Sequence, residues 1–416
     1  MPDTKDFRTI DEQIEGLEKR GLQFKNKKKA VDILKKYNYF DVINGFESIL
    51  LKRNVGVKEY ENIYFEDFKD LYFFDLTLKK DTLFKIFDIE SRLRTSIAYN
   101  FTSKYCSSAK DTMNYTDPKY YKKPTDVHLK KIFLRFDLFR QTQVDVHGKV
   151  KRKSFIDELK LEREYVGQYK NPPFWVVIKT LPLGSLYYTF IFLDDTVKEK
   201  VLKDFGLELV DADLFEQALF VLKEVRNQCA HLELITRFRL KRSKGLNYLN
   251  DITVKANLSH GDINYLDVVR IFRVFGTVSD IKREILLFYL KMLGKRRKEI
   301  ADKRILKNRI VYLFDEIIAD EINRYDSCGN DPDLAQNMIQ QLLEFIEKHY
   351  FDIPRKKIIK IISRRLEEIR EIDNSSIILG YSPEKILEGF LIKLAEFYDY
   401  KLSPNFLEKY EKELPH

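Results

Sequence analysis

An arginine, an asparagine and a histidine lie close together in the segment "VRNQCAHLEL". Arg226 is followed directly by Asn227, and His231 comes four residues after Asn227. A guanidinium group can neutralise phosphate oxygens, and an imidazole exchanges protons near neutral pH. Residues of these types could bind a phosphate and move a proton, so the segment around Arg226, Asn227 and His231 is a candidate functional site.

The helical periodicity of this segment predicts that Arg226 lies on one side of the helix and that Asn227 and His231 lie on the other. At about 100° per residue, Arg226 falls within the apolar arc of the helix, whereas Asn227 and His231 fall opposite it. In one continuous helix the directions of Arg226 and His231 diverge by about 140°. We therefore expect the helix to bend or end near the motif, or the arginine to reach around it.

A charged residue at a core-facing position requires a partner, because an unpaired buried charge is very costly. Glu90, at an apolar-phase position in "IESRLR", is the candidate partner of Arg226. The alternative interpretation of Arg226 is a structural ion pair between two helices. A second arginine–histidine pair, Arg140 and His147 in "RQTQVDVH", has similar spacing but no polar residue after the arginine. We interpret it as an exposed basic loop.

Composition limits the kinds of protein that this chain can be. The 416 residues carry a formal net charge of +9, which favours a polyanionic partner such as nucleic acid or simply reflects a lysine-rich proteome. The three cysteines are far apart, and no phosphate loop or zinc-ligand set is present, so an NTPase or a zinc enzyme is disfavoured. We expect no cofactor and no metal. The charged N-terminus and the lack of a long apolar run predict a cytoplasmic protein without a membrane segment.

The fold prediction is all-α, because glycine and proline are scarce and apolar residues recur at helical spacing. Thr9 and Glu12 form a predicted capping box at the start of the first helix. Further helical patterns are expected at 27–52, 65–105, 181–193, 213–234, 262–293, 301–325, 333–350 and, in three parts, 355–416. Residues 106–173 are less regular and are a possible inserted lobe.

Several segments resemble the AbiD/AbiF-like abortive infection proteins, a branch of the HEPN ribonuclease superfamily. The resemblance covers roughly residues 8–240 and rests on "AVDILKKYNYFDVINGF", "DIESRLRTSIAYNF", "NPPFWVVIKTLPLGSLYYTF" and "VRNQCAHLELITRF", in that order. It implies an all-α, HEPN-type helical bundle at 1–250 and an additional helical region at 251–416. It also implies a catalytic R-x4-H motif formed by Arg226 and His231, in which Asn227 orients the histidine or donates a hydrogen bond to the phosphate. Glu90 and Arg94 would support this motif.

The resemblance implies cleavage of RNA without a metal ion, through attack of the 2′-OH on the adjacent phosphate. Two motifs usually face each other across a dimer in this superfamily, so we expect a homodimer. The implied setting is antiphage defence or a toxin–antitoxin system, and the resemblance also suggests a small noncoding RNA as a partner that could restrain the nuclease. A basic run after His231 is a candidate RNA-binding segment: Arg237, Arg239, Lys241, Arg242 and Lys244. The alternatives are a non-catalytic RNA-binding protein and a helical interaction scaffold.

Overall fold

A computed structural model describes residues 6–51, 59–147, 149–241 and 262–277, with the isolated positions 281, 285, 363 and 364. The chain divides into two compact units, residues 1–277 and 278–416. Almost all of the described residues belong to the first unit. The helices expected at 301–325, 333–350 and 355–416 lie outside the described residues, except for positions 363 and 364. The division into 1–250 and 251–416 stays a prediction.

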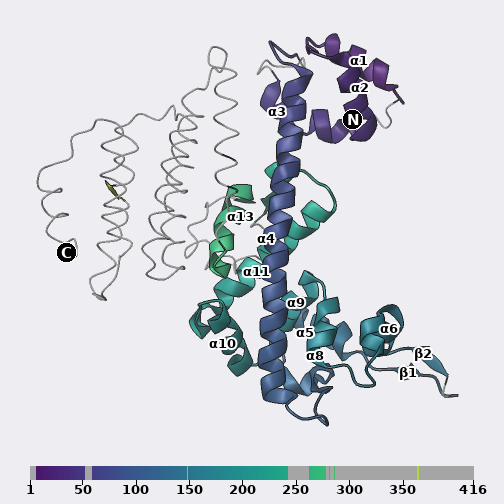
Figure 1. The fold of residues 1–416 in the computed structure, drawn as a ribbon, viewed down its shortest axis with the longest axis vertical. Coiled ribbons are helices and arrows are strands. Elements are labelled where there is room, and N and C mark those ends of the chain that lie inside the picture. Colours follow the sequence, from purple (N-terminus) through teal and green to yellow (C-terminus); the bar gives the residue numbers. More distant parts are fainter. Residues whose placement is uncertain are drawn as a thin grey trace, which may run out of the picture. The chain divides into compact units, whose positions relative to one another are not determined.

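Helix α4 is the central element of the first unit and extends from Phe65 to Tyr105, the bounds that the periodicity predicts. Its 41 residues correspond to a length of about 60 Å, and the other helices pack along it (Figure 1). One long face of α4 is buried, and most of that face is apolar. Charged residues interrupt it at Asp75, Lys79 and Glu90, each less than 6% exposed. These three positions connect α4 to the candidate site.

The N-terminal helices lie near the start of α4 (Figure 1). Helix α1, Ile10–Glu18, begins at the predicted capping box of Thr9 and Glu12. The expected helix at 27–52 is wrong as a continuous element. It consists of α2 (Lys27–Lys36), the π-helix η1 (Phe40–Asn44) and α3 (Glu47–Leu50). The Asn38 side chain accepts a hydrogen bond from the Phe40 amide at 2.8 Å, a local bond that competes with helix continuation.

Residues 106–173 form short elements rather than a long helix. They are η2 (Asn114–Thr116), η3 (Pro118–Tyr120), α5 (Val127–Leu134), η4 (Asp137–Phe139), the hairpin of β1 (Gln143–Val144) and β2 (Val150–Arg152), α6 (Phe155–Glu162) and α7 (Glu164–Gly167). Aromatic side chains join this segment to the helical core. The Phe101 and Tyr121 rings stack with centroids 4.9 Å apart, and the Tyr115 and Phe174 rings stack at 4.8 Å.

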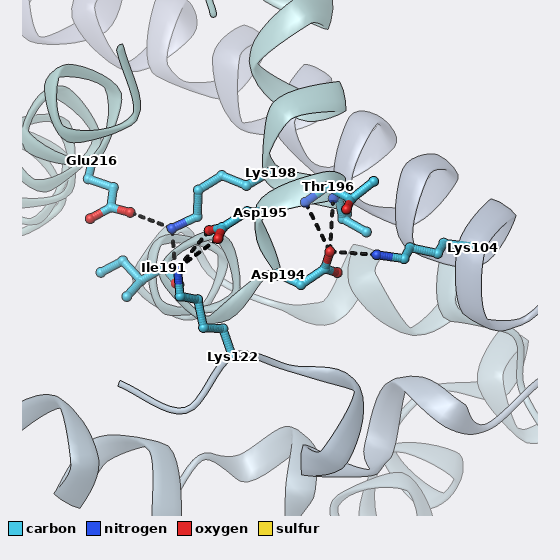
Figure 2. A network of polar contacts seen from close by, with 9 residues as sticks. Lys104, Lys122, Ile191, Asp194, Asp195, Thr196, Lys198 and Glu216 are labelled. Atoms are coloured by element: carbon cyan, nitrogen blue, oxygen red, sulfur yellow. Dashed lines mark hydrogen bonds and ion pairs between the residues drawn. The ribbon is translucent and has the colours of Figure 1, made fainter. Parts of the chain in front are cut away.

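The following helices complete the packing around α4. They are α8 (Phe174–Val177), η5 (Ile178–Thr180), α9 (Leu183–Phe192), α10 (Asp195–Asp204), η6 (Leu209–Asp211) and α11 (Ala212–Ala230). The apolar stretch 181–193 contains a buried helix, as predicted. Figure 2 shows the polar network at the start of α10: Lys104 of α4 contacts Asp194 at 2.6 Å, and Lys198 contacts Glu216 of α11 at 2.8 Å. The network fixes α10 against both helices.

The last described elements return to the same core. They are η7 (Ile235–Arg237), β3 (Arg239–Leu240), β4 (Ile263–Asn264), α13 (Tyr265–Ile271) and η9 (Phe272–Phe275). The Thr82 and Tyr265 hydroxyls are 2.7 Å apart, which ties α13 to α4. Helices dominate the described residues, whose β structure is limited to two two-stranded sheets and one isolated bridge between Gln23 and Tyr64, so the all-α prediction is confirmed. In the same part of the chain, no helix has the length and apolar character needed to cross a bilayer.

Candidate active site

Helix α11 carries the candidate catalytic motif near its C-terminal end. Its apolar residues pack inward, and Phe215, Leu219 and Leu222 are fully buried. Arg226 is half-buried, whereas Asn227 and His231 are exposed. The side of the helix predicted for each residue therefore agrees with its exposure.

Arg226 lies near a buried carboxylate without pairing with it. Glu90 of α4 forms its ion pair with Arg94, four residues later on the same helix. Burial raises the pKa of Glu90, while the charges of Arg94 and Arg226 act in the opposite direction. The direct ion pair between Arg226 and Glu90 that the sequence suggested is therefore not formed, because Arg94, one helical turn away on α4, pairs with the Glu90 carboxylate instead. Arg226 attracts that carboxylate only at longer range. Among the described residues, Arg226 has no hydrogen bond or ion pair of its own.

Helix α11 ends at the motif, which is one of the arrangements expected from the divergent directions of Arg226 and His231. His231 is the C-cap residue, and its amide donates to the Asn227 carbonyl oxygen at 3.0 Å. The amides of Leu232 and Glu233 donate to the carbonyl oxygens of Cys229 and Gln228, both at 3.1 Å. These two bonds form a Schellman motif, in which the residue after the cap is usually glycine. Here that residue is Leu232, with a left-handed φ of 60°.

A buried ion pair on α4 holds the chain directly after His231. The Lys79 ammonium donates to the Leu232 carbonyl oxygen at 3.1 Å and contacts Asp75 at the same distance. Asp75 accepts hydrogen bonds from the Thr236 amide at 2.9 Å and from its hydroxyl at 2.8 Å. Both charged residues are at most 4% exposed. The pair therefore fixes residues 232–236, and with them the end of α11 where His231 lies.

This ion pair was not predicted from the sequence, although a signal was present. Asp75 and Lys79 are one helical turn apart and lie in the same apolar phase of α4 as Glu90. A charged residue in that phase needs a buried partner, as argued for Arg226. The partner groups of Asp75 and Lys79 include backbone atoms of residues 232 and 236, which the periodicity of α4 does not reveal.

Residues 32–235 match the model of a family described as Abi-like protein. The chain belongs to this family. No curated protein and no solved structure matches the chain. The Abi-like segment contains Glu90, Arg94, Arg226, Asn227 and His231. It ends between Leu232, which Lys79 contacts, and Thr236, which Asp75 contacts. Membership of the family suggests a role in abortive infection.

The basic run lies immediately beyond the Abi-like segment. Arg237, Arg239 and Lys241 are exposed. Arg239 is in β3, where it pairs with Asn264 of β4, and Arg237 donates to the Asn44 carbonyl oxygen at 3.1 Å. Arg242 and Lys244 lie outside the described residues. The described members of the run thus present positive charge to solvent close in the chain to His231.

The second arginine–histidine pair of the Abi-like domain does not form a comparable site. Arg140 makes two contacts with the Glu158 carboxylate, at 2.7 and 2.6 Å, and it also donates to the Lys153 carbonyl oxygen. His147 is exposed in the turn between β1 and β2. Arg140 is consequently occupied by a structural contact, which distinguishes it from Arg226.

Other reactive groups near the motif are held in an unreactive form. Cys229 lies between Arg226 and His231 in the sequence. Its side chain is buried, and burial raises the pKa of its thiol to about 12. The thiol is therefore protonated at neutral pH, which argues against a role as a nucleophile. In the described part of the Abi-like chain, no three His, Cys, Asp or Glu side chains gather as a metal-ligand set.

Proposed function

We propose that this protein is a metal-independent endoribonuclease that acts as a toxin in abortive infection or in a toxin–antitoxin system. Its catalytic residues would be Arg226 and His231, with Asn227 in a positioning role. Glu90 and Arg94 would support Arg226. The proposal refines the abortive infection role suggested by the family, and the R-x4-H interpretation comes from the resemblance to HEPN ribonucleases.

The state of Arg226 is the observation that carries the proposal. Glu90 is the carboxylate partner that the sequence suggested for Arg226, but here Arg94 forms the ion pair with Glu90. Arg226 remains near the negative charge without a hydrogen bond or ion pair among the described residues. Its guanidinium donors are therefore available to a phosphate, for which their planar arrangement is well suited.

The proposed reaction is an internal transesterification. The 2′-oxygen of a ribose attacks the neighbouring phosphorus, and the bond from phosphorus to the 5′-oxygen of the next nucleotide breaks. The 2′-OH proton passes to a base, and the leaving 5′-oxygen takes up a proton from an acid. His231 is suited to this proton exchange because it is an exposed imidazole at a fixed helix end. Arg226 would stabilise the charge that develops on the phosphorane oxygens.

A homodimer would bring a second motif to the same phosphodiester. His231 and Asn227 are on the outer side of α11, so a second copy can approach them. The exposed residues Arg237, Arg239 and Lys241 would contact the RNA backbone, which requires little sequence specificity. The same contacts could hold a small noncoding RNA that restrains the toxin.

Induced expression of the wild-type protein tests the proposal directly. Growth should stop, and total RNA should acquire new ends with a 2′,3′-cyclic phosphate and a 5′-hydroxyl. Arg226→Ala and His231→Ala should each abolish both effects. His147→Ala is the matched control, because it removes another exposed imidazole and should leave both effects unchanged. Toxicity that persists in the first two variants would refute the catalytic assignment.

Non-catalytic RNA binding is the competing function, and the exposed basic run favours it independently of Arg226. Under that function, purified wild type and His231→Ala bind RNA equally and neither produces cyclic phosphate ends. Under the proposed function, the variant binds RNA but does not cut it. Quantifying cyclic phosphate ends from a defined RNA, with EDTA present, separates the two functions and also tests metal independence.

A further inference from the structure

A groove of about 720 Å³ lies between α4 and the segment formed by α8 and η5. Its walls include Arg94, Thr95 and Tyr99 of α4, and Trp175 and Lys179 of the opposite segment. The volume is within the range of about 300–1,000 Å³ that is typical of sites for organic ligands. Arg94 also belongs to the ion pair beside Arg226, so the groove adjoins the candidate active site.

The two aromatic residues in this groove are exposed and rigidly supported. Tyr99 is 73% exposed and Trp175 is 56% exposed. Their neighbours Phe101 and Phe174 are fully buried, and the Phe101 and Phe174 rings contact each other with centroids 5.4 Å apart. The buried pair locks together the two backbone segments that carry Tyr99 and Trp175. Large aromatic faces held open to solvent in this way are typical of binding surfaces.

The charges in the groove favour an anionic ligand. Lys179 is cationic, and the described residues that line the groove include no carboxylate. Arg94 adds a second guanidinium, whose charge is partly balanced by its ion pair with Glu90. The Lys179 ammonium lies over the Tyr165 ring, 5.3 Å from its centroid. The Arg94 guanidinium is held by the Leu181 carbonyl oxygen, 2.9 Å from Nη2, and by Glu90. Both cations are thus positioned before any ligand binds.

We propose that this groove binds an unpaired segment of RNA, with bases stacked on Tyr99 and Trp175 and phosphates beside Lys179 and Arg94. Stacking on aromatic side chains requires bases that are free of a duplex, so the ligand is single-stranded. That the nucleic acid is RNA rests on the proposed function. The groove would then hold nucleotides next to the phosphodiester that Arg226 contacts.

Trp175 is the only tryptophan of the chain, so its fluorescence reports on this groove alone. The full-length protein is titrated with a 12-nucleotide 2′-O-methyl RNA, which cannot undergo attack by a 2′-OH, and with the corresponding duplex. We expect the single strand to quench the fluorescence, and the duplex to quench it much less. Failure of the single strand to change the fluorescence at concentrations where labelled RNA is bound would overturn the proposal.

Variants measured with a fluorescently labelled copy of the single strand give the second test. Trp175→Ala should weaken binding by about tenfold, and Trp175→Phe, which retains an aromatic face, by less than threefold. Phe40→Ala is the control, because Phe40 is similarly exposed (61%) and lies outside the groove. Unchanged RNA affinity in Trp175→Ala would reject RNA binding at this groove. This conclusion holds whatever oligomeric state sedimentation gives for the variant.

The outcomes for the groove and for the proposed function are separable. If wild type quenches with the single strand but never cleaves RNA, the groove assignment stands and the nuclease proposal fails. If wild type cleaves RNA and Trp175→Ala cleaves it with unchanged kcat and KM, the nuclease proposal stands and the groove assignment fails.

Discussion

Lys79 donates a hydrogen bond to the carbonyl oxygen of Leu232, which lies 153 residues later in the chain. The bond joins the middle of α4 to the residue that follows His231. Leu232 has a left-handed backbone, which costs a non-glycine residue about 1–2 kcal/mol. Such strain persists where surrounding contacts enforce it, commonly at functional sites. The contacts of Lys79 and Asp75 with residues 232–236 supply that enforcement.

Lys79→Met should strongly destabilise the protein. Methionine preserves much of the side-chain length, but it leaves the carboxylate of Asp75 buried without its counter-charge. Loss of one member of a buried pair costs about 3–5 kcal/mol in the free energy of unfolding. Urea denaturation followed by circular dichroism measures the change. Lys80→Met, at an exposed position on the same helix, should change the stability little, and equal losses in the two variants would contradict the role of the buried pair.

Leu232→Gly should stabilise the protein. Glycine adopts the left-handed backbone without a steric penalty, and the 68% exposed leucine side chain makes little contribution to the core. The greater backbone entropy of glycine in the unfolded chain offsets part of this effect. The free energy of unfolding should therefore increase by about 0.5–1 kcal/mol. Leu232→Ala removes most of the side chain but keeps the strain, so its stability should stay below that of Leu232→Gly. Equal stabilities would show that the backbone is not strained there.

Glu90→Gln should change the dependence of stability on pH. Burial raises the pKa of Glu90 above 4.5, so the folded protein holds this proton more tightly than the unfolded chain does. The contribution of Glu90 to the free energy of unfolding is therefore complete at low pH and is lost as the pH rises through the folded-state pKa. Glutamine does not titrate, and its amide oxygen can still accept from Arg94.

The free energy of unfolding of Glu90→Gln, relative to wild type, should therefore increase as the pH rises above 4.5. Urea titrations between pH 5 and 8 measure this difference. Glu162→Gln, at an exposed position in α6, serves as the control for a generic loss of one carboxylate. A difference between Glu90→Gln and wild type that does not vary with pH would contradict the effect of burial.

Local sequence signals predicted much of the fold. The capping box at Thr9 and the apolar periodicity of 65–105 correspond to the observed elements, because both depend on residues within one or two turns. The break in 27–52 was not predicted because the hydrogen bond that the Asn38 side chain accepts from the Phe40 amide competes with an otherwise helical pattern. The β1–β2 hairpin was also missed, since its strands have only two and three residues.

The candidate site was predictable only in part, because its partners come from distant segments. Periodicity indicated the inward direction of Arg226 and the apolar phase of Glu90. It did not indicate that Arg94 would take Glu90 as its partner. The Lys79 contact with a backbone carbonyl depends on how α4 packs against α11 and η7, and backbone atoms leave no residue-type signal. The exposed face of Trp175 likewise follows from the burial of its neighbour Phe174.

Neutralising part of the basic run should reduce the salt dependence of RNA binding. Arg239 and Lys241 are exposed, and each phosphate contact with a single strand contributes about 0.7 to the slope of log affinity against log salt. Arg239→Gln combined with Lys241→Gln should therefore lower the slope by about 1.4 if both residues contact phosphates. Binding of labelled RNA across a series of salt concentrations provides the slope. Lys28→Gln with Lys35→Gln removes the same charge from exposed positions of α2 and should leave the slope unchanged; an equal decrease would indicate only a general effect of net charge.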